Sequence, residues 1–251
     1  MIEIISTVIN NSHPLNDKYK PYLKGLFIPN DYNSKNLDDW TYDIVHKDLV
    51  NLKNLSLAKN LKILILYGSL RQHSYSRLLS YEAARIFHHL GADVKIYNPS
   101  QLPLKDDVSD NHFKVQELKS LIEWSDANFW CSPENHGCIS GVMKTQLDHL
   151  PVFSTQSKVL SVNQVNGGSQ SFNTVNNLRV LGRWLRMYTI QNQSSIPNVW
   201  KFFNSSGRFV PSPYRDRLVD VCEELIKLSC LLSNHHDFLS NSYTRRKSIK
   251  H

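Results

Sequence analysis

The feature that most constrains the fold is a regular alternation of short apolar runs and amphipathic segments that begins at residue 61. The apolar runs end at glycine, proline or polar residues and are predicted strands, at 61–67, 93–97, 128–131, 158–165 and 187–190. Segments with apolar residues at helical spacing follow them in turn, at 75–90, 113–124, 141–150, 172–185 and 213–232. Strands that alternate with helices of this length are typical of βαβ units around a parallel sheet.

This alternation predicts an α/β fold, a flavodoxin-like doubly wound five-stranded parallel sheet of order 2-1-3-4-5 with an N-terminal arm. Ligands of such sheets bind outside the carboxyl ends of the strands, at the switch point beside the first strand. The first, third and fourth strands are neighbours in this order. We therefore expect the loops after these three strands to form the functional site.

The chain divides into three predicted parts: an N-terminal arm at 1–60, a flavodoxin-like domain at 61–234 and a basic tail at 235–251. The arm has three prolines and a polar run, with scattered apolar and aromatic residues. It is too apolar for pure disorder and too irregular for a domain. We expect it to pack on its own core or on a neighbouring subunit, and we expect anchors such as Leu23, Phe27 and Trp40 to be buried across a subunit boundary.

Charge and composition exclude several classes of protein. The formal net charge is +7, and the last eight residues supply Arg245, Arg246, Lys247 and Lys250. Basic residues cluster only in this tail, so we expect a solvated tail and no nucleic-acid partner. No apolar run approaches 18 residues and the start does not resemble a signal peptide, so we expect a cytoplasmic protein with no membrane partner.

The cysteines and histidines do not predict a metal centre. The four cysteines, at positions 131, 138, 222 and 230, have spacings that match neither a zinc site nor a redox motif. We interpret them as reduced, buried packing residues. His235 and His236 are followed by Asp237, but matching ligands are lacking and no metal site is expected.

The loop after the first strand combines residues that bind phosphate groups. Gly68 ends the strand, and Ser69, Arg71, Ser74 and Ser76 precede or open the expected helix. Free N–H groups and the dipole at a helix N-terminus favour an anion, while the hydroxyls add donors and the arginine adds charge. The pattern is neither a Walker A loop nor GxGxxG, and it suits a monophosphate, as in FMN, better than a pyrophosphate. One serine alone is more typical of a helix cap.

The loop after the third strand has a composition suited to a rigid wall beside a flat ring. It contains Pro133, Gly137 and the side-chain amide of Asn135. Glu134 is not expected to be a catalytic acid, because no partner carboxylate lies nearby in the sequence. His136 taken alone fits an ordinary loop histidine equally well.

The loop after the fourth strand contains Gly167 and Gly168. Two glycines let the backbone approach a ligand closely, and N–H groups at a helix start can hold a developing negative charge. Reduced flavin needs such donors near its N1–O2 edge, so this loop is expected beside the ring.

Several motifs stand in the order found in one known family. They include G-S-L-R-x-x-S-Y-S-R at 68–77, W-C-S-P-E-x-H-G at 130–137 and G-G-S-Q-S-F-N at 167–173. On these motifs the chain resembles the ArsH family of NADPH-dependent FMN reductases over roughly residues 60–232. The first motif alone is shared by the wider FMN reductase superfamily, whereas the set is specific.

The resemblance implies a cytoplasmic enzyme that uses FMN and NADPH. It implies reduction of acceptors such as quinones, azo dyes, ferric iron or oxygen, oxidation of trivalent organoarsenicals, and a homotetramer whose arms embrace neighbouring subunits. No single catalytic side chain is expected, because hydride transfer needs chiefly two stacked rings. The implied cofactor-binding residues are Ser69, Arg71, Ser74, Tyr75, Ser76, Pro133, Glu134, Asn135, His136, Gly137, Gly168, Ser169, Gln170 and Phe172.

The chain departs from the family pattern at two places. Asn135 stands where the family usually has arginine. The segment between Pro151 and Lys158 is shorter than in the family and lacks an arginine. Both changes are expected to remove positive charge near the active-site rim and to alter nicotinamide binding or acceptor choice.

The alternative is a flavodoxin-like electron carrier or a flavin-binding redox regulator without reductase turnover. Electron-transfer flavodoxins are usually acidic and place aromatic rings around the flavin. This chain is basic, and its predicted flavin loops are poor in tryptophan. The sequence therefore favours the reductase.

Overall fold

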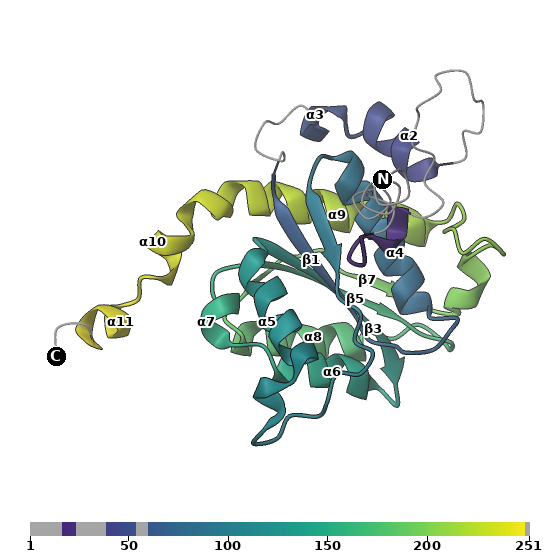
Figure 1. The fold of residues 1–251 in the computed structure, drawn as a ribbon. Coiled ribbons are helices and arrows are strands. Elements are labelled where there is room, and N and C mark those ends of the chain that lie inside the picture. Colours follow the sequence, from purple (N-terminus) through teal and green to yellow (C-terminus); the bar gives the residue numbers. More distant parts are fainter. Residues whose placement is uncertain (1–16, 24–38, 54–59, 249–251) are drawn as a thin grey trace, which may run out of the picture.

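The computed structural model describes residues 17–23, 39–53 and 60–248 of the 251-residue chain. Its central sheet has the strand order β2-β1-β3-β5-β6, with every neighbouring pair parallel (Figure 1). This confirms the predicted five-stranded order. The strands are β1 Lys62–Tyr67, β2 Asp93–Ile96, β3 Ala127–Asn135, β5 Val159–Val165 and β6 Tyr188–Thr189.

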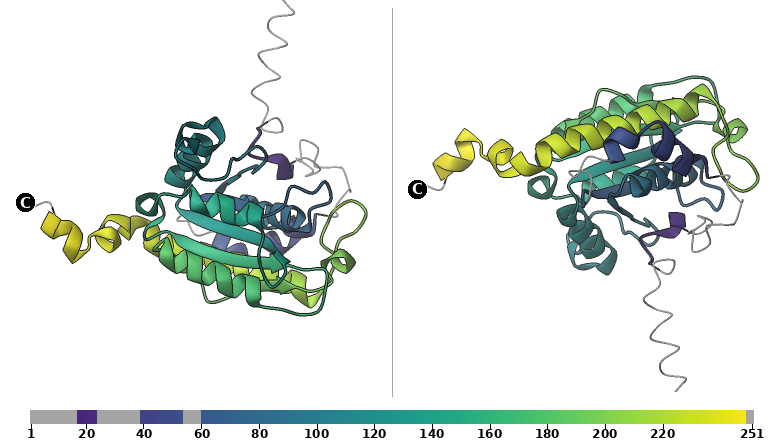
Figure 2. Two further views of the ribbon diagram at one scale, coloured as in Figure 1. Left: turned by 90° about the horizontal axis from the view of Figure 1, so that it is seen from below. Right: turned by 90° about the horizontal axis from the view of Figure 1, so that it is seen from above.

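Helices cover both faces of this sheet and bury two separate apolar clusters. Side chains of a strand alternate between the faces, so Ile63 and Ile65 of β1 pack with α4 and α9, while Leu64 and Leu66 pack with α5, α6 and α8. Figures 1 and 2 show the sheet between these two helical layers. The helices are α4 Tyr75–His89, α5 Phe113–Trp124, α6 Gly141–Asp148, α8 Asn173–Trp184 and α9 Pro213–Leu232.

Two elements at the carboxyl edge of the sheet differ from the sequence prediction. β3 continues past its predicted end and pairs antiparallel with β4 Cys138–Ile139. His136 and Gly137 form the two-residue turn with positive φ angles of 52° and 74°, as a type I′ hairpin requires. An unpredicted short strand, β7 Ser194–Ile196, pairs with the end of β5, so β6 and β7 share the outer side of that strand.

The described parts of the N-terminal arm pack on the chain's own core. They form a single turn at Pro21–Leu23 and the helices α2 Trp40–Lys47 and α3 Val50–Lys53. Leu23 is 4% exposed, and Trp40 packs against the same apolar cluster. Leu23 is thus buried within the chain and Trp40 is partly buried there, because the chain's own core offers them an apolar face. Phe27, the third, lies outside the described residues.

A buried cluster of charges ties the arm to the domain. Glu82 on α4 is fully buried and accepts hydrogen bonds from Arg208 Nε at 2.7 Å and from the Phe209 backbone at 3.2 Å. The same arginine reaches Asp39, the N-cap of α2, at 2.6 Å. Arg85 lies 3.2 Å from the Glu82 carboxylate. One carboxylate therefore links α4, the arm and the segment around residue 208.

The shortened segment before β5 lies at the opposite edge of the sheet from the predicted site. It forms α7 Val152–Thr155, and Thr155 donates to the Leu185 carbonyl at 2.7 Å, near the start of β6. The seven residues of β5 separate this edge from the carboxyl ends by roughly 20 Å. Within one chain, the shortened segment is therefore too far from the predicted site to alter its rim, and that prediction is wrong.

Lys158, at the end of this segment, predicts a pH dependence of stability. Burial lowers the pKa of Lys158 to about 8, while its Nζ caps α5 through the carbonyls of Ile122 and Glu123. As pH rises from about 8 to about 10.5, the folded chain loses this proton before the unfolded chain does, so stability rises. Urea unfolding at about pH 7 and about pH 9.5 should show wild type gaining stability relative to Lys158→Met. An equal difference at both pH values would contradict this.

The C-terminal residues extend away from the body of the molecule in Figures 1 and 2. They form α10 His236–Ser240 and α11 Tyr243–Ser248, with Arg246 and Lys247 exposed. His236 contacts the Gln156 carbonyl at 2.8 Å, which holds the start of this tail on the domain. Among the helices of the described residues, none is long and apolar enough to cross a membrane.

Candidate functional site

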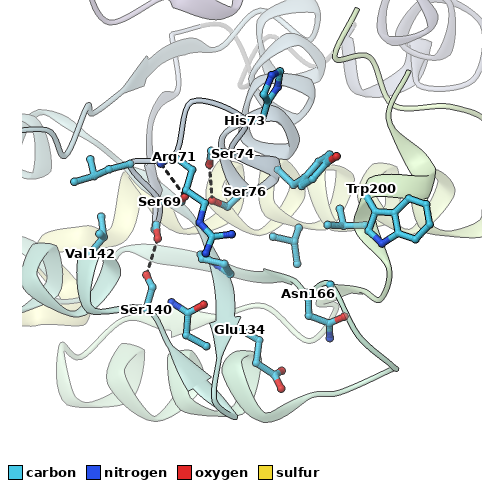
Figure 3. Close-up of a pocket in the computed structure, with 18 of the residues that line it drawn as sticks. Ser69, Arg71, His73, Ser74, Ser76, Glu134, Ser140, Val142, Asn166 and Trp200 are labelled. Atoms are coloured by element: carbon cyan, nitrogen blue, oxygen red, sulfur yellow. Dashed lines mark hydrogen bonds between the residues drawn. The ribbon is translucent and has the colours of Figure 1, made fainter. Parts of the chain in front are cut away.

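A cavity of about 800 Å³ opens at the carboxyl ends of β1, β3 and β5 (Figure 3). The loops that follow these three strands line it, together with a fourth segment at Val199 and Trp200. Because the three strands are adjacent in the sheet, residues far apart in the sequence meet here. The cavity thus lies at the predicted switch point.

The loop after β1 supplies the hydroxyl and cationic side of the cavity. Ser74 caps α4 by accepting from the Arg77 backbone at 3.1 Å, and its hydroxyl lies 3.1 Å from that of Ser76. Ser69 accepts from the Arg71 backbone at 3.3 Å, which curls the loop. The Arg71 side chain is exposed and extends among the lining residues (Figure 3). The cavity is lined by Ser69, Arg71, Ser74, Tyr75 and Ser76.

A second helix N-terminus faces the same cavity. Ser140 caps α6 by accepting from the Met143 backbone at 3.1 Å, and its hydroxyl donates to the Gly68 carbonyl at 2.6 Å. Gly141 and Val142, in the first turn of α6, line the cavity. The N-termini of α4 and α6 therefore both direct partial positive charge into one space, which favours an anion. The contribution of α6 was not predicted from the sequence.

Gly68, which follows β1, lies in close contact with Pro133 of β3 and with Ser140, the N-cap of α6. A Cβ added there would lie 2.7 Å from Ser140 Oγ and 3.0 Å from Pro133 Cδ. Gly68→Val is expected to lower the free energy of unfolding by about 1–3 kcal/mol, the typical cost of overpacking. Gly167→Ala is the matched control, because a Cβ there meets no atom within 4 Å and should not lower stability. Equal stability of the two variants in denaturant melts would refute the close approach.

The β3 hairpin forms one wall, with Pro133, Glu134 and Asn135 lining the cavity. The Glu134 carboxylate is held by Gln164 Nε2 at 2.8 Å. His136 and Gly137 form the turn at the hairpin tip, beyond the lining residues. The prediction that these two residues bind the cofactor is therefore not supported, because β3 extends to Asn135 and places them at the tip of the hairpin.

The loop after β5 is divided between two cavities. Val165, Asn166 and Gly167 line the first cavity, whereas Gly168 and Ser169 lie past its lining residues. The backbone of Asn198, just after β7, donates to the Gly168 carbonyl at 3.0 Å and fixes this part of the loop.

Gln170 and Phe172, predicted beside the cofactor, line a second cavity instead. Gln170 Nε2 bonds the Ser195 side chain at 3.0 Å, and Ser195 in turn donates to the Ser171 carbonyl at 2.5 Å. Because β7 pairs with β5 at this point, these contacts turn the loop away from the first cavity.

Sequence reasoning missed Trp200 as a lining residue. It lies in the short 3₁₀ helix Val199–Phe202 that follows β7, and the residue is 54% exposed beside the cavity (Figure 3). The loops predicted to bind the flavin are poor in tryptophan, but they do not include this segment, which reaches the site because it follows β7. The only signal in the sequence was the large aromatic residue itself, ten residues after the predicted last strand.

Comparison with known proteins agrees with this site. A model of the family described as NADPH-dependent FMN reductase matches residues 61–201. The proteins named NADPH-dependent FMN reductase ArsH from Shigella flexneri and Acidithiobacillus ferrooxidans are 52% and 51% identical to the chain. The matches cover 77% and 74% of the chain, and 78% and 81% of those proteins. The chain belongs to the NADPH-dependent FMN reductase family, among the ArsH proteins.

A solved structure supports the fold alone. The flavoenzyme FerB, an NAD(P)H:acceptor oxidoreductase from Paracoccus denitrificans, superposes with a TM-score of 0.57 at 17% identity. The match covers 70% of the chain and 98% of FerB. It confirms the flavodoxin-like fold predicted from the sequence.

The residues of the first cavity fit the FMN that the family name implies. The volume lies within the usual range of cofactor sites. Added Cβ atoms at Gly141 and Gly167 would meet no atom within 4 Å, so the backbone there is open to a ligand. Asn166 Oδ1 is a buried acceptor with no hydrogen-bond partner among the described residues. A cofactor with an anionic end would suit the two helix N-termini, and a ring N–H would supply the donor that Asn166 Oδ1 lacks.

Proposed function

We propose that this chain is an ArsH-type reductase that binds FMN in the first cavity and takes hydride from NADPH. The observation that carries the proposal is the convergence of two helix N-termini, four serines and Arg71 on one space. A phosphate dianion is the ligand that this set of donors and charges suits best. Family membership supports the same assignment.

In this proposal the loop after β1 anchors the cofactor phosphate. Ser69 and Ser76 donate hydroxyl protons, while the N–H groups at the start of α4 and the Arg71 guanidinium balance the charge. The hydrogen bond from Ser140 to the Gly68 carbonyl fixes the loop against α6. Binding thus occurs at a prearranged surface, which reduces the ordering cost.

The flavin ring would lie between the β3 wall and Trp200. Pro133 and Asn135 offer one side, and the exposed indole offers an aromatic face on another. Asn166 Oδ1 supplies an acceptor and Gly167 an open backbone. When bound, FMN supplies the two-electron acceptor for the hydride, and the protein's part is to hold the two rings together and exclude water.

Steady-state turnover tests the proposal. The FMN-loaded protein should oxidise NADPH faster than NADH, with quinone, azo-dye, ferric or oxygen acceptors. An electron carrier or redox regulator would bind flavin yet show no sustained nucleotide oxidation. A loaded protein without turnover, or one that prefers NADH, would therefore overturn the proposal. We place the enzyme in the cytoplasm, and a homotetramer is the assembly that light scattering should show.

We further propose that the enzyme oxidises trivalent organoarsenicals, on the strength of its identity with ArsH proteins. In this conversion of methylarsenite to methylarsonate, water would supply the added oxygen atom and bound oxidised FMN would accept the two electrons that arsenic loses; oxygen would then reoxidise the flavin with release of hydrogen peroxide. Holoprotein incubated with NADPH and methylarsenite in air should form pentavalent product faster than apoprotein, as measured by arsenic speciation. A product that disappears when catalase removes peroxide would refute direct oxidation and leave only a reductase.

A further inference from the structure

A second cavity of about 700 Å³ adjoins the first across the loop at 166–171. Gly167 lines the first cavity and Gln170 the second, three residues apart, so their Cα atoms lie within about 11 Å. The segment after β7 lines the first cavity at Val199 and Trp200 and also lies close to the second. Its Phe202 ring lies 4.9 Å from the ring of Tyr214, which lines the second cavity. A ligand longer than this separation can occupy both cavities.

The second cavity has a cationic lining. Arg179 and Arg217 line it with amide and hydroxyl side chains, and no acidic residue is among the described residues of the lining. Two carboxylates lie just outside. Glu224 accepts from the backbones of Gln191 and Asn192. Asp220 is 3.6 Å from the Arg217 guanidinium. The cavity therefore attracts an anion rather than a cation.

The two arginines have different roles. Arg179 bonds the carbonyls of Ile190 at 2.9 Å and Gln191 at 2.6 Å and the side chain of Gln193 at 2.6 Å, so it is a fixed part of the wall. Arg217 is half exposed and uses only Nη1, which donates to Asn192 at 2.7 Å. Within the described part of the chain, its Nε and Nη2 groups have no acceptor and remain available to a ligand.

Two aromatic side chains line the second cavity together with these arginines. Phe172 is 49% exposed, and Tyr214 stands in the first turn of α9, where the cavity meets the helix. A planar base can stack on such rings while an adjacent anion meets the guanidinium. The combination is the recognition chemistry of a purine nucleotide that carries a phosphate.

We propose that the second cavity is the subsite for the adenosine 2′-phosphate of NADPH, with Arg217 as the residue that distinguishes NADPH from NADH. This inference rests on the proposed function, because the nicotinamide end must occupy the first cavity beside FMN. It assigns Gln170 and Phe172 to the nucleotide rather than to the flavin.

The test uses FMN-loaded full-length protein and two probes, adenosine 2′,5′-bisphosphate and adenosine 5′-monophosphate, in calorimetric titrations. Wild type should bind the bisphosphate at least about tenfold more tightly, the effect of one hydrogen bond to a charged group. Arg217→Ala should remove most of this preference. Arg183→Ala, an exposed arginine of α8 outside both cavities, should retain it.

Kinetics give a second readout. Arg217→Ala should raise KM for NADPH about tenfold and leave KM for NADH, kcat and flavin absorbance unchanged. Equal affinity of wild type for the two probes, or equal losses in both variants, would overturn the subsite even if NADPH is oxidised. If the loaded protein oxidises no nucleotide, the proposed function fails, while the calorimetric comparison still decides the subsite.

Discussion

Replacing Glu82 with alanine is expected to lower the free energy of unfolding by about 3–5 kcal/mol, the usual result of removing one partner from a buried ion pair. Glu82 is fully buried, and its loss leaves Arg85 and Arg208 without their shared carboxylate. The Phe209 backbone N–H also loses its acceptor. Because Arg208 also holds Asp39, the arm should loosen together with the domain.

Denaturant unfolding measures this loss. Glu223→Ala on α9 is the matched control, because its pair with Lys227 lies at the surface and such pairs contribute less than about 1 kcal/mol. Amide exchange in α2 should increase in Glu82→Ala and remain unchanged in Glu223→Ala. A Glu82→Ala protein as stable as the control would show that the buried cluster does not stabilise the arm.

Replacing Arg71 with alanine is expected to weaken FMN binding by about 1.5–3 kcal/mol, which corresponds to roughly 10- to 150-fold in Kd. The side chain is exposed and extends into the cavity, so its removal takes away phosphate contacts without disturbing the core. Arg183→Ala again serves as the control. Flavin fluorescence titration gives both affinities, and equal values would remove Arg71 from the cofactor site.

The sequence predicted the sheet order and the long helices because their signals are local. The helices at 113–124 and 213–232 have the bounds expected from their periodicity and flanking residues. The loop after β1 was equally predictable, because its serines, its arginine and the helix start are adjacent in the sequence. For these elements, the residues that carry the signal are close together in the sequence, so the sequence alone was sufficient.

The remaining parts of the site depend on pairing between distant segments. β7 has only three residues, Ser194–Ile196, too short for a periodic signal, and it exists because it pairs with β5. Through it, Trp200 reaches the first cavity and Gln170 the second. The β3 hairpin was missed because its turn places His136, a non-glycine residue, at positive φ.

The arm shows the same limit. In the described part of the arm, scattered apolar residues without a period indicated packing, but they did not reveal the partner. Leu23 and Trp40 pack on the domain, and Asp39 joins its buried charges. No local pattern predicts that a residue at 39 meets one at 208.

The most direct test of the account is a comparison of FMN with riboflavin, which carries the same ring and ribityl chain without the phosphate. If Ser69, Arg71, Ser76 and the two helix N-termini hold the phosphate, at least two charge-assisted hydrogen bonds are lost with riboflavin. Titration of the apoprotein should then show FMN binding at least about 100-fold more tightly than riboflavin. Equal affinity for the two flavins, or no flavin binding at all, would contradict the assignment of this cavity.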